Sequence, residues 1–155
     1  MPAAIQLDKF DKEILGILQK DCRMTIKEIA SKISLTTTPI FERIKKMERA
    51  GLIKQYVALL DEKILGKNLN AFIDISIKDH SKNAIEDFIK DVIVHPEVME
   101  CHHVTGESDF LLRVLVADVE EYNLFVLNKL STVSNIGKVE TRFSLSVRKN
   151  THVIG

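Results

Sequence analysis

The sequence TIKEIASKISLTTTPIFERIKKMERAG, residues 25–51, predicts two helices joined by a short turn in the N-terminal part of the chain. Thr25 and Glu28 stand three residues apart, which is the spacing of a capping box at a helix start. The apolar residues that follow recur at helical spacing as far as Ile33 and predict a short helix over 25–33. This helix therefore carries an apolar stripe along one face.

A second helix is predicted about three residues further along the chain. It opens at Thr36–Thr38, where Pro39 suits the first turn because its missing N–H needs no partner there. It ends before Gly51, a residue type that adopts the left-handed conformation found just after helices. Leu7 to Leu18 supplies a preceding helix, with Asp8 favouring its start. Two helices joined by so short a connection have the spacing of a helix-turn-helix.

The two faces of the helix that follows the turn differ in chemistry. At about 100° per residue, the side chains that gather on the apolar face are Ile40, Ile44 and Met47. Those on the opposite face, with Arg43 on the flank, are Thr38, Glu42, Lys45, Lys46 and Arg49. The DNA major groove accepts a helix whose first residues reach base edges, while Lys and Arg nearby bind phosphates. The pattern favours DNA binding, although a plain three-helix bundle with a hydrated outer face fits the same amphipathicity.

Composition excludes several classes of protein. The 155 residues include 22 Lys+Arg against 22 Asp+Glu, and 45% are hydrophobic, as in an ordinary globular protein. Apolar runs are short, residues 1–6 show no signal peptide, and the only cysteines are Cys22 and Cys101. We therefore exclude a membrane protein, a disulfide miniprotein and a long disordered chain, and we expect a reducing cytoplasm.

Charge is unevenly distributed along the chain. Residues 1–65 hold 12 Lys+Arg against 9 Asp+Glu, whereas residues 66–155 hold 10 against 13. A protein of zero net charge can thus present a local basic surface that attracts a polyanion.

The second half alternates between strand and helix patterns. The expected elements are a strand over 71–77, a helix over 84–93, strands over 98–104 and 110–117, a helix over 119–130 and a strand over 137–147. This βαββαβ order is that of a ferredoxin-like domain, an antiparallel sheet with two helices on one face. The other face needs cover, and β-branched residues there would suit a partner subunit. Residues 53–60, just before this domain, are predicted to be extended.

Four stretches resemble the Lrp/AsnC family of leucine-responsive, or feast/famine, regulators. They are LDKFDKEIL at 7–15, LQKDCR at 18–23, TPIFERIKKMERAGLI at 38–53 and ECHHVTGESDFLL at 100–112. Each is unspecific alone, but their joint order and spacing are very specific, and the likeness spans nearly the whole chain.

The resemblance implies a transcription regulator of the α+β class. Its parts would be a winged helix-turn-helix over 1–52, a linking strand or hinge over 53–68 and a ferredoxin-like effector-binding and oligomerisation domain over 69–155. The implied partners are double-stranded DNA, a small amino-acid effector bound between subunits, and copies of the chain itself, as a homodimer that assembles to a tetramer or octamer. No cofactor, metal or membrane is implied.

The family's motifs also imply site residues. Those expected at DNA are Thr36, Thr37, Thr38, Pro39, Arg43, Lys46 and Arg49. Those expected at the effector are Val104, Thr105, Gly106, Glu107, Ser108, Asp109 and Thr141. Gly106 allows a close backbone approach, and exposed amides can take a carboxylate. Asp109 either accepts hydrogen bonds from an ammonium group or fixes the loop. Without the flanking likeness, this Gly-x-x-Asp pattern is typical of an ordinary hairpin turn.

Two other functions are weighed against this one. Cys101, His102 and His103 suggest a metal site, but alternate residues of a strand face opposite ways and no second ligand pair has zinc-like spacing. Sirohaem decarboxylases resemble this architecture but need many Arg and His residues around a tetrapyrrole, and their motifs are missing here. We therefore expect a protein that is not an enzyme.

Overall fold

The computed structural model describes residues 5–154, which form two compact units. The helical unit contains the residues up to Leu59 and those from Lys149 on, and the sheet unit runs from Leu60 to Arg148. Residues 1–4 and 155 lie outside the described residues. They include the two ends of the expected domains and most of the stretch inspected for a signal peptide. None of the described helices is long and apolar enough to cross a bilayer.

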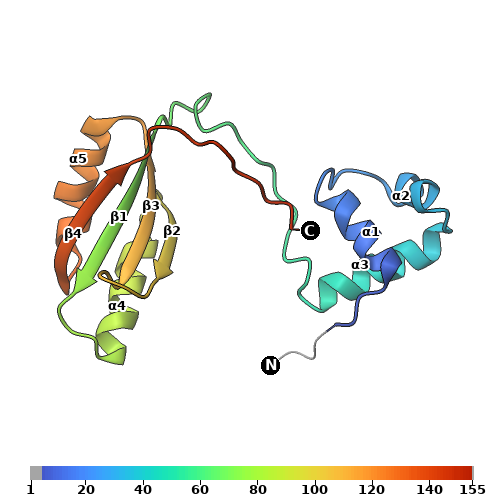
Figure 1. Cartoon of the computed structure of the whole chain (residues 1–155), viewed down its shortest axis with the longest axis horizontal. Helices are drawn as coiled ribbons and strands as arrows, with labels where there is room; N and C mark the ends of the chain where they lie inside the picture. Colours follow the sequence, from blue (N-terminus) through green and yellow to red (C-terminus); the bar gives the residue numbers. More distant parts are fainter. Residues whose placement is uncertain (1–4, 155) are drawn as a thin grey trace. The chain divides into compact units, whose positions relative to one another are not determined.

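Three helices make up the helical unit (Figure 1): α1 (Lys9–Leu18), α2 (Ile26–Ile33) and α3 (Thr37–Arg49). Their apolar stripes meet in a small core, whose buried members are Ile14, Ile29, Ala30, Ile40, Ile44 and Met47. The predicted inward face of the third helix is therefore confirmed. Ser34 ends α2 with a left-handed backbone, φ 56°, and forms the turn that leads into α3.

The helix ends follow from the sequence. Thr25 and Glu28 form the predicted capping box of α2, with reciprocal side-chain-to-backbone bonds. Asp8 is the N-cap of α1, and its partner in a second capping box is Asp11. Gly51 takes the left-handed conformation, φ 71°, one residue after the C-cap of α3.

The segment that connects the two units differs from expectation. Within the described chain, no strand is assigned anywhere in residues 53–68. Val57, Leu59 and Leu60 stay largely exposed, because no strand among residues 5–154 pairs with them. Near its start, Tyr56 donates a hydrogen bond to Glu48 over 3.1 Å, which ties the segment to α3.

The C-terminal segment of the chain returns to the helical unit. Gln19, the C-cap of α1, donates its amide to the Ile154 carbonyl over 2.9 Å. Its side-chain oxygen accepts the Ile154 N–H over 2.6 Å. The side chain thus pairs with the backbone as a neighbouring strand would.

The sheet unit has the predicted βαββαβ order. Its elements are β1 (Leu69–Ile77), α4 (Lys82–Ile93), β2 (Val98–His103), β3 (Phe110–Val116), α5 (Val119–Asn128), a short 3-10 helix (Leu130–Thr132) and β4 (Ile136–Phe143). The strands form one antiparallel sheet in the order β2-β3-β1-β4, and α4 and α5 cover one of its faces (Figure 1).

The core of the sheet unit lies between the sheet and these two helices. Alternate residues of β1 and β3 point into it, and the Phe88 ring of α4 packs at a tilt of 41° against Phe110, with ring centroids 4.6 Å apart. The β-branched residues of the central strands, such as Ile73, Ile75 and Val114, belong to this inner face.

The outer face of the sheet is therefore not the β-branched surface that we expected. Its pairs include Phe72 with Arg113 and Asp74 with Leu111, and Arg142 of β4 forms an ion pair with Asp74. This expectation is wrong because the strand alternation places the β-branched side chains under the helices and leaves a mixture of charged and large apolar ones outside.

β4 also ends earlier than predicted. Val139, Thr141 and Phe143 share the helix side of the sheet, as the alternation required, but pairing with β1 stops at Phe143. Leu145 is 99% exposed as a result, and Val147 is exposed as well. The alternating pattern continues here without a partner strand in the described chain.

Candidate functional site

The outer face of α3 presents the basic side chains that the sequence predicted. Lys46 and Arg49 are exposed, and neither has a carboxylate partner among the described residues. Lys45 is also exposed but forms an ion pair with Glu48 over 2.7 Å. Since Ile40 and Ile44 are buried on the opposite side, these cations face solvent.

The N-terminus of α3 is open. Thr36 is its N-cap, but in the described chain no side chain bonds the first backbone N–H groups. Thr36, Thr37 and Thr38 are all exposed, and Pro39 follows them in the first turn. Unpaired N–H groups at the positive end of a helix dipole are suited to binding a phosphate.

Arg43 has a different environment from the other predicted DNA residues. Its guanidinium lies 2.6 Å from a carboxylate oxygen of Asp8 and 2.7 Å from one of Asp11. Only 3% of the Asp11 side chain is exposed, and Arg43 also lies over the Phe10 ring. The hydrogen bonds to Asp11 and Asp8 raise the pKa of Arg43. Arg43 thus joins the centre of α3 to the start of α1.

Only part of this ion cluster, the pairing of Asp8 with Asp11, could be predicted from the sequence. Asp8 and Asp11 have capping-box spacing, and the backbone N–H of Asp11 together with Arg43 holds the pKa of Asp8 below its ordinary value. Nothing local in the sequence links this pair to Arg43, because the contact spans two helices far apart in the chain.

The loop between β2 and β3 carries the predicted effector residues. Val104 donates its N–H to the Asp109 carbonyl over 2.8 Å, and this bond closes the base of the loop. The Ser76 hydroxyl donates to the Glu107 carbonyl over 3.2 Å. Gly106, at the tip, has φ 131° and open space around it. The loop therefore has a fixed base and an accessible tip.

Asp109 uses both carboxylate oxygens inside the chain. One accepts the backbone N–H of Ile77 over 2.8 Å, and the other lies 2.9 Å from Nε2 of His80. These bonds, that from Ile77 first, hold the pKa of Asp109 below its ordinary value. Of the two roles considered for Asp109, this geometry supports fixing the loop. The sequence alone gave no sign of His80.

Thr141 is not brought to this loop within one chain. It pairs with the buried Ile73, and its hydroxyl lies 2.5 Å from that of Tyr122 on the helix side of the sheet. The loop is bonded instead to the outward-facing Ser76, and Ser108 donates to the outward-facing Asp74 over 3.3 Å.

The residues considered for other functions have structural partners. Cys101 lies on the inner side, where burial raises its pKa, and His103 stacks on Phe110 at 4.7 Å. The described residues contain no cluster of three or more potential metal ligands. Arg113 of β3 is a residue of the type that a tetrapyrrole site would need, and it already bonds Glu62 and Glu100.

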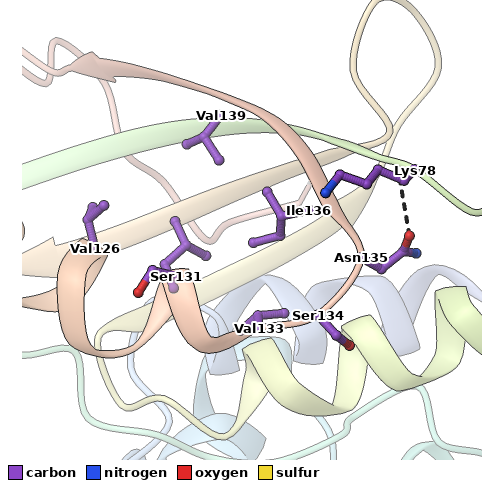
Figure 2. Close-up of a pocket in the computed structure, with 9 residues that line it drawn as sticks. Lys78, Val126, Ser131, Val133, Ser134, Asn135, Ile136 and Val139 are labelled. Carbon is purple, nitrogen blue, oxygen red and sulfur yellow. Dashed lines mark hydrogen bonds between the residues drawn. The ribbon is translucent and has the colours of Figure 1, made fainter.

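A hollow of about 450 Å³ opens beside the start of β4 (Figure 2). Its apolar lining comes from Val126, Leu130, Val133, Ile136 and Val139. At its rim the backbone N–H of Lys78 donates to the Asn135 side chain. None of the described effector-site candidates lines it.

Two family models match the chain in succession. Residues 7–54 match a winged helix-turn-helix DNA-binding domain, and residues 70–154 match the Lrp/AsnC ligand binding domain. The chain is 36% identical over 145 residues to the DNA-binding transcriptional activator DecR of Escherichia coli K12, a match that covers 94% of this chain and 95% of that protein. It is 34% identical over 145 residues to the leucine-responsive regulatory protein of Rhizobium meliloti, covering 94% and 93%.

Solved structures give the same result. A transcriptional regulator of Neisseria meningitidis, in complex with L-Met, superposes with a TM-score of 0.91 at 36% identity over 97% of both chains. An AsnC family transcriptional regulator of Agrobacterium tumefaciens has a TM-score of 0.91 at 34% identity, over 96% of this chain and 97% of that one.

Proposed function

The chain belongs to the Lrp/AsnC family, and from this premise we propose that it binds double-stranded DNA through α3 and responds to a free amino acid held by the 104–109 loop. It is a DNA-binding transcription regulator. The observation that carries the DNA part is the exposed face of α3, where Lys46 and Arg49 point to solvent opposite a buried apolar stripe.

The roles at DNA divide by environment. Thr36, Thr37 and Thr38, at the open start of α3, contact phosphates or bases, and Pro39 lies beside them without an N–H to donate. Lys46 and Arg49 contact phosphates. Arg43 acts indirectly, since its guanidinium bonds Asp8 and Asp11 and so sets the angle at which α3 meets the groove.

The effector part rests on the loop of residues Val104–Asp109. Its tip at Gly106 is accessible while its base is fixed, so its backbone amides can take the carboxylate of an amino acid without reorganising. Thr141 belongs to the site only if a neighbouring subunit supplies it. The complex of the Neisseria regulator makes L-methionine the first candidate ligand.

Assembly follows from surfaces that a single chain leaves uncovered. Leu59, Leu60, Leu145 and Val147 are exposed apolar residues in segments with strand-like sequence but no partner strand in the described chain. A second copy would cover them, because unpaired apolar strands favour association. We propose a homodimer that assembles further to a tetramer or octamer, acting in the cytoplasm without a cofactor.

Control is allosteric in this proposal. An effector bound between subunits favours one assembly over another, and the paired α3 helices then match or miss the spacing of the operator half-sites. A coupling free energy of about 1–3 kcal/mol between the two ligands is enough for regulation.

Two measurements test the function. A thermal-unfolding screen against the twenty amino acids at millimolar concentration should show selective stabilisation, since a ligand at 100 times its Kd adds about 2.7 kcal/mol to the free energy of unfolding. In the second measurement, the protein captures fragments of the genomic DNA of its own source organism at increasing salt concentration, and a few sites should be enriched among the fragments recovered. Equal recovery of all fragments at every salt concentration contradicts sequence-specific binding.

A further inference from the structure

His80 lies in the turn that joins β1 to α4, and this turn is held in place by Asn135. The Asn135 side-chain oxygen accepts the backbone N–H of Asp79 over 2.7 Å, and its amide donates to the Asp79 carbonyl over 2.8 Å. Asp79 in turn accepts the N–H of Ser81 over 2.8 Å. The backbone around His80 is therefore fixed from both sides, although 60% of the imidazole side chain is exposed.

This turn places the imidazole against the end of the effector loop. Nε2 of His80 lies 2.9 Å from Oδ1 of Asp109, the last residue before β3. Oδ2 of the same carboxylate accepts the N–H of Ile77 over 2.8 Å. Together the two contacts fix the rotation of the carboxylate. With only one oxygen held, the carboxylate could still rotate about that single contact.

Asp109 transmits this constraint to the loop. Its own N–H donates to the Ile75 carbonyl over 2.9 Å, and its carbonyl accepts the N–H of Val104 at the other end of the loop over 2.8 Å. A carboxylate that turned away would release Ile77 and loosen the bonds that close the loop base. His80 therefore stands at the outer end of a chain of contacts that reaches both ends of the loop.

We infer that His80 is a positioning residue of the effector site, which fixes Asp109 and thereby the backbone amides that receive the carboxylate of a free amino acid. The inference rests on the proposed function for its ligand, and it makes Asp109 a support of the loop that leaves the ammonium group to other groups of the site. It assigns to the β1–α4 turn, outside the loop itself, a share of the affinity for the effector.

The test compares three variants of the full chain with the wild type. His80→Ala removes the contact, and His80→Gln keeps an amide N–H near the position of Nε2. The matched control is His102→Ala, since His102 is 55% exposed and is paired to Glu100 at 3.0 Å in the same way. Amide hydrogen exchange at Ile77 and Val104 is measured without ligand, and the Kd for L-methionine is measured by titration calorimetry.

We expect His80→Ala to speed exchange at both amides about fivefold, which corresponds to the loss of one ordinary hydrogen bond. The Kd for L-methionine should rise by a similar factor. His80→Gln should return both the exchange rates and the Kd most of the way to the wild-type values, and His102→Ala should match the wild type in both. A general loss of folding would speed exchange across the whole sheet, which separates it from the local effect expected here.

The failures are distinguishable. Unchanged exchange at Ile77 in His80→Ala overturns the inference whatever binds. Faster exchange with an unchanged Kd shows that the contact supports the loop without serving the site, and this also overturns it. If the wild type binds neither L-methionine nor any of the other nineteen common amino acids, the proposed effector function fails and the inference falls with it.

Discussion

The helical unit and the sheet unit stabilise their functional elements in different ways. Among the described residues, the helical unit buries six apolar side chains in its core, whereas the sheet unit buries thirteen. The smaller core is supplemented by a charged cluster, in which the buried Asp11 meets Arg43. In the sheet unit, the loop of residues 104–109 is attached to β1 by hydrogen bonds that involve Ser76 and Ile77.

This difference indicates how each unit can be modified without losing its fold. In the helical unit α3, the element that we propose reads DNA, is also part of the core, so a change on its inner side should affect stability and binding together. In the sheet unit the loop of residues 104–109 lies outside the core, so the effector contacts that we propose for it can change while the sheet persists. Regulators with the same architecture can thus differ in effector more readily than in fold.

The greatest loss of stability is expected from a change in the core of the sheet unit. Phe88→Ala deletes a fully buried ring and should lower the free energy of unfolding by about 3–5 kcal/mol. Amide exchange should then quicken across the sheet while α1–α3 keep their protection, because each unit has its own core. Ile93→Ala is the control, since Ile93 lies on the same helix but is 56% exposed. Equal acceleration in both units would mean that they unfold as one.

The next effect concerns the helical unit. Arg43→Met keeps most of the side-chain volume but leaves the buried Asp11 without its cation, and it should cost about 2–3 kcal/mol in urea unfolding. Lys46→Met, on the exposed face of the same helix, should change stability by no more than about 0.5 kcal/mol. Similar losses in the two variants would contradict the structural role given to Arg43.

A smaller effect distinguishes Lys46, which we propose contacts phosphate, from Arg43, which we propose acts indirectly. Lys46→Ala should weaken operator binding and reduce the slope of log K against log salt by about 1, since one phosphate contact is lost. Arg43→Met, measured where it is folded, should keep the wild-type slope. The measurement is fluorescence anisotropy over a salt series. A reduced slope for Arg43→Met would show that Arg43 also contacts phosphate.

The smallest effect is a pH dependence of the helical unit. The Thr25 hydroxyl and backbone N–H hold the pKa of Glu28 below its ordinary value. Its contribution to stability is therefore present above the ordinary glutamate pKa and is lost as the pH falls from that ordinary value through the lowered one. Glu28→Gln lacks this contribution at every pH. The difference between the free energies of unfolding of the wild type and of Glu28→Gln, measured with urea, should therefore shrink over this window.

Thr25→Ser is the control for this prediction, because it keeps the hydroxyl and should follow the wild-type profile. A constant gap between wild type and Glu28→Gln from pH 7 to pH 3 would contradict the capping role of the carboxylate.

Local rules of the sequence were sufficient for most of the fold. The capping box of Thr25 and Glu28, the inward stripe of α3 and the βαββαβ order all follow from spacing between near neighbours, and the structure confirms them. The family that these motifs resemble is also confirmed. Strand limits were predicted less well, because Leu145 continues the alternation of β4 without a partner to pair with in the described chain.

The site needed information that no local rule contains. Arg43 has the type and helix position of a DNA contact, and only the fold shows that Asp11 lies beside it. His80 likewise meets Asp109 across a gap of many residues, and nothing in the turn around it predicts the contact. The outer face of the sheet was misjudged for a similar reason, since the face that a strand turns to the helices is decided by the whole sheet.

The pairing of Gln19 with Ile154 has a consequence for the order of events during synthesis. The helices of the DNA-reading unit leave the ribosome first and can fold while the sheet unit is still being made. The segment that pairs with Gln19 emerges only after β4, so the helical unit is completed last although it begins first. A nascent chain stalled within the sheet unit would therefore display α3 without this final contact. A fusion partner attached after residue 154 would lie next to the contact with Gln19 and could disturb the helical unit.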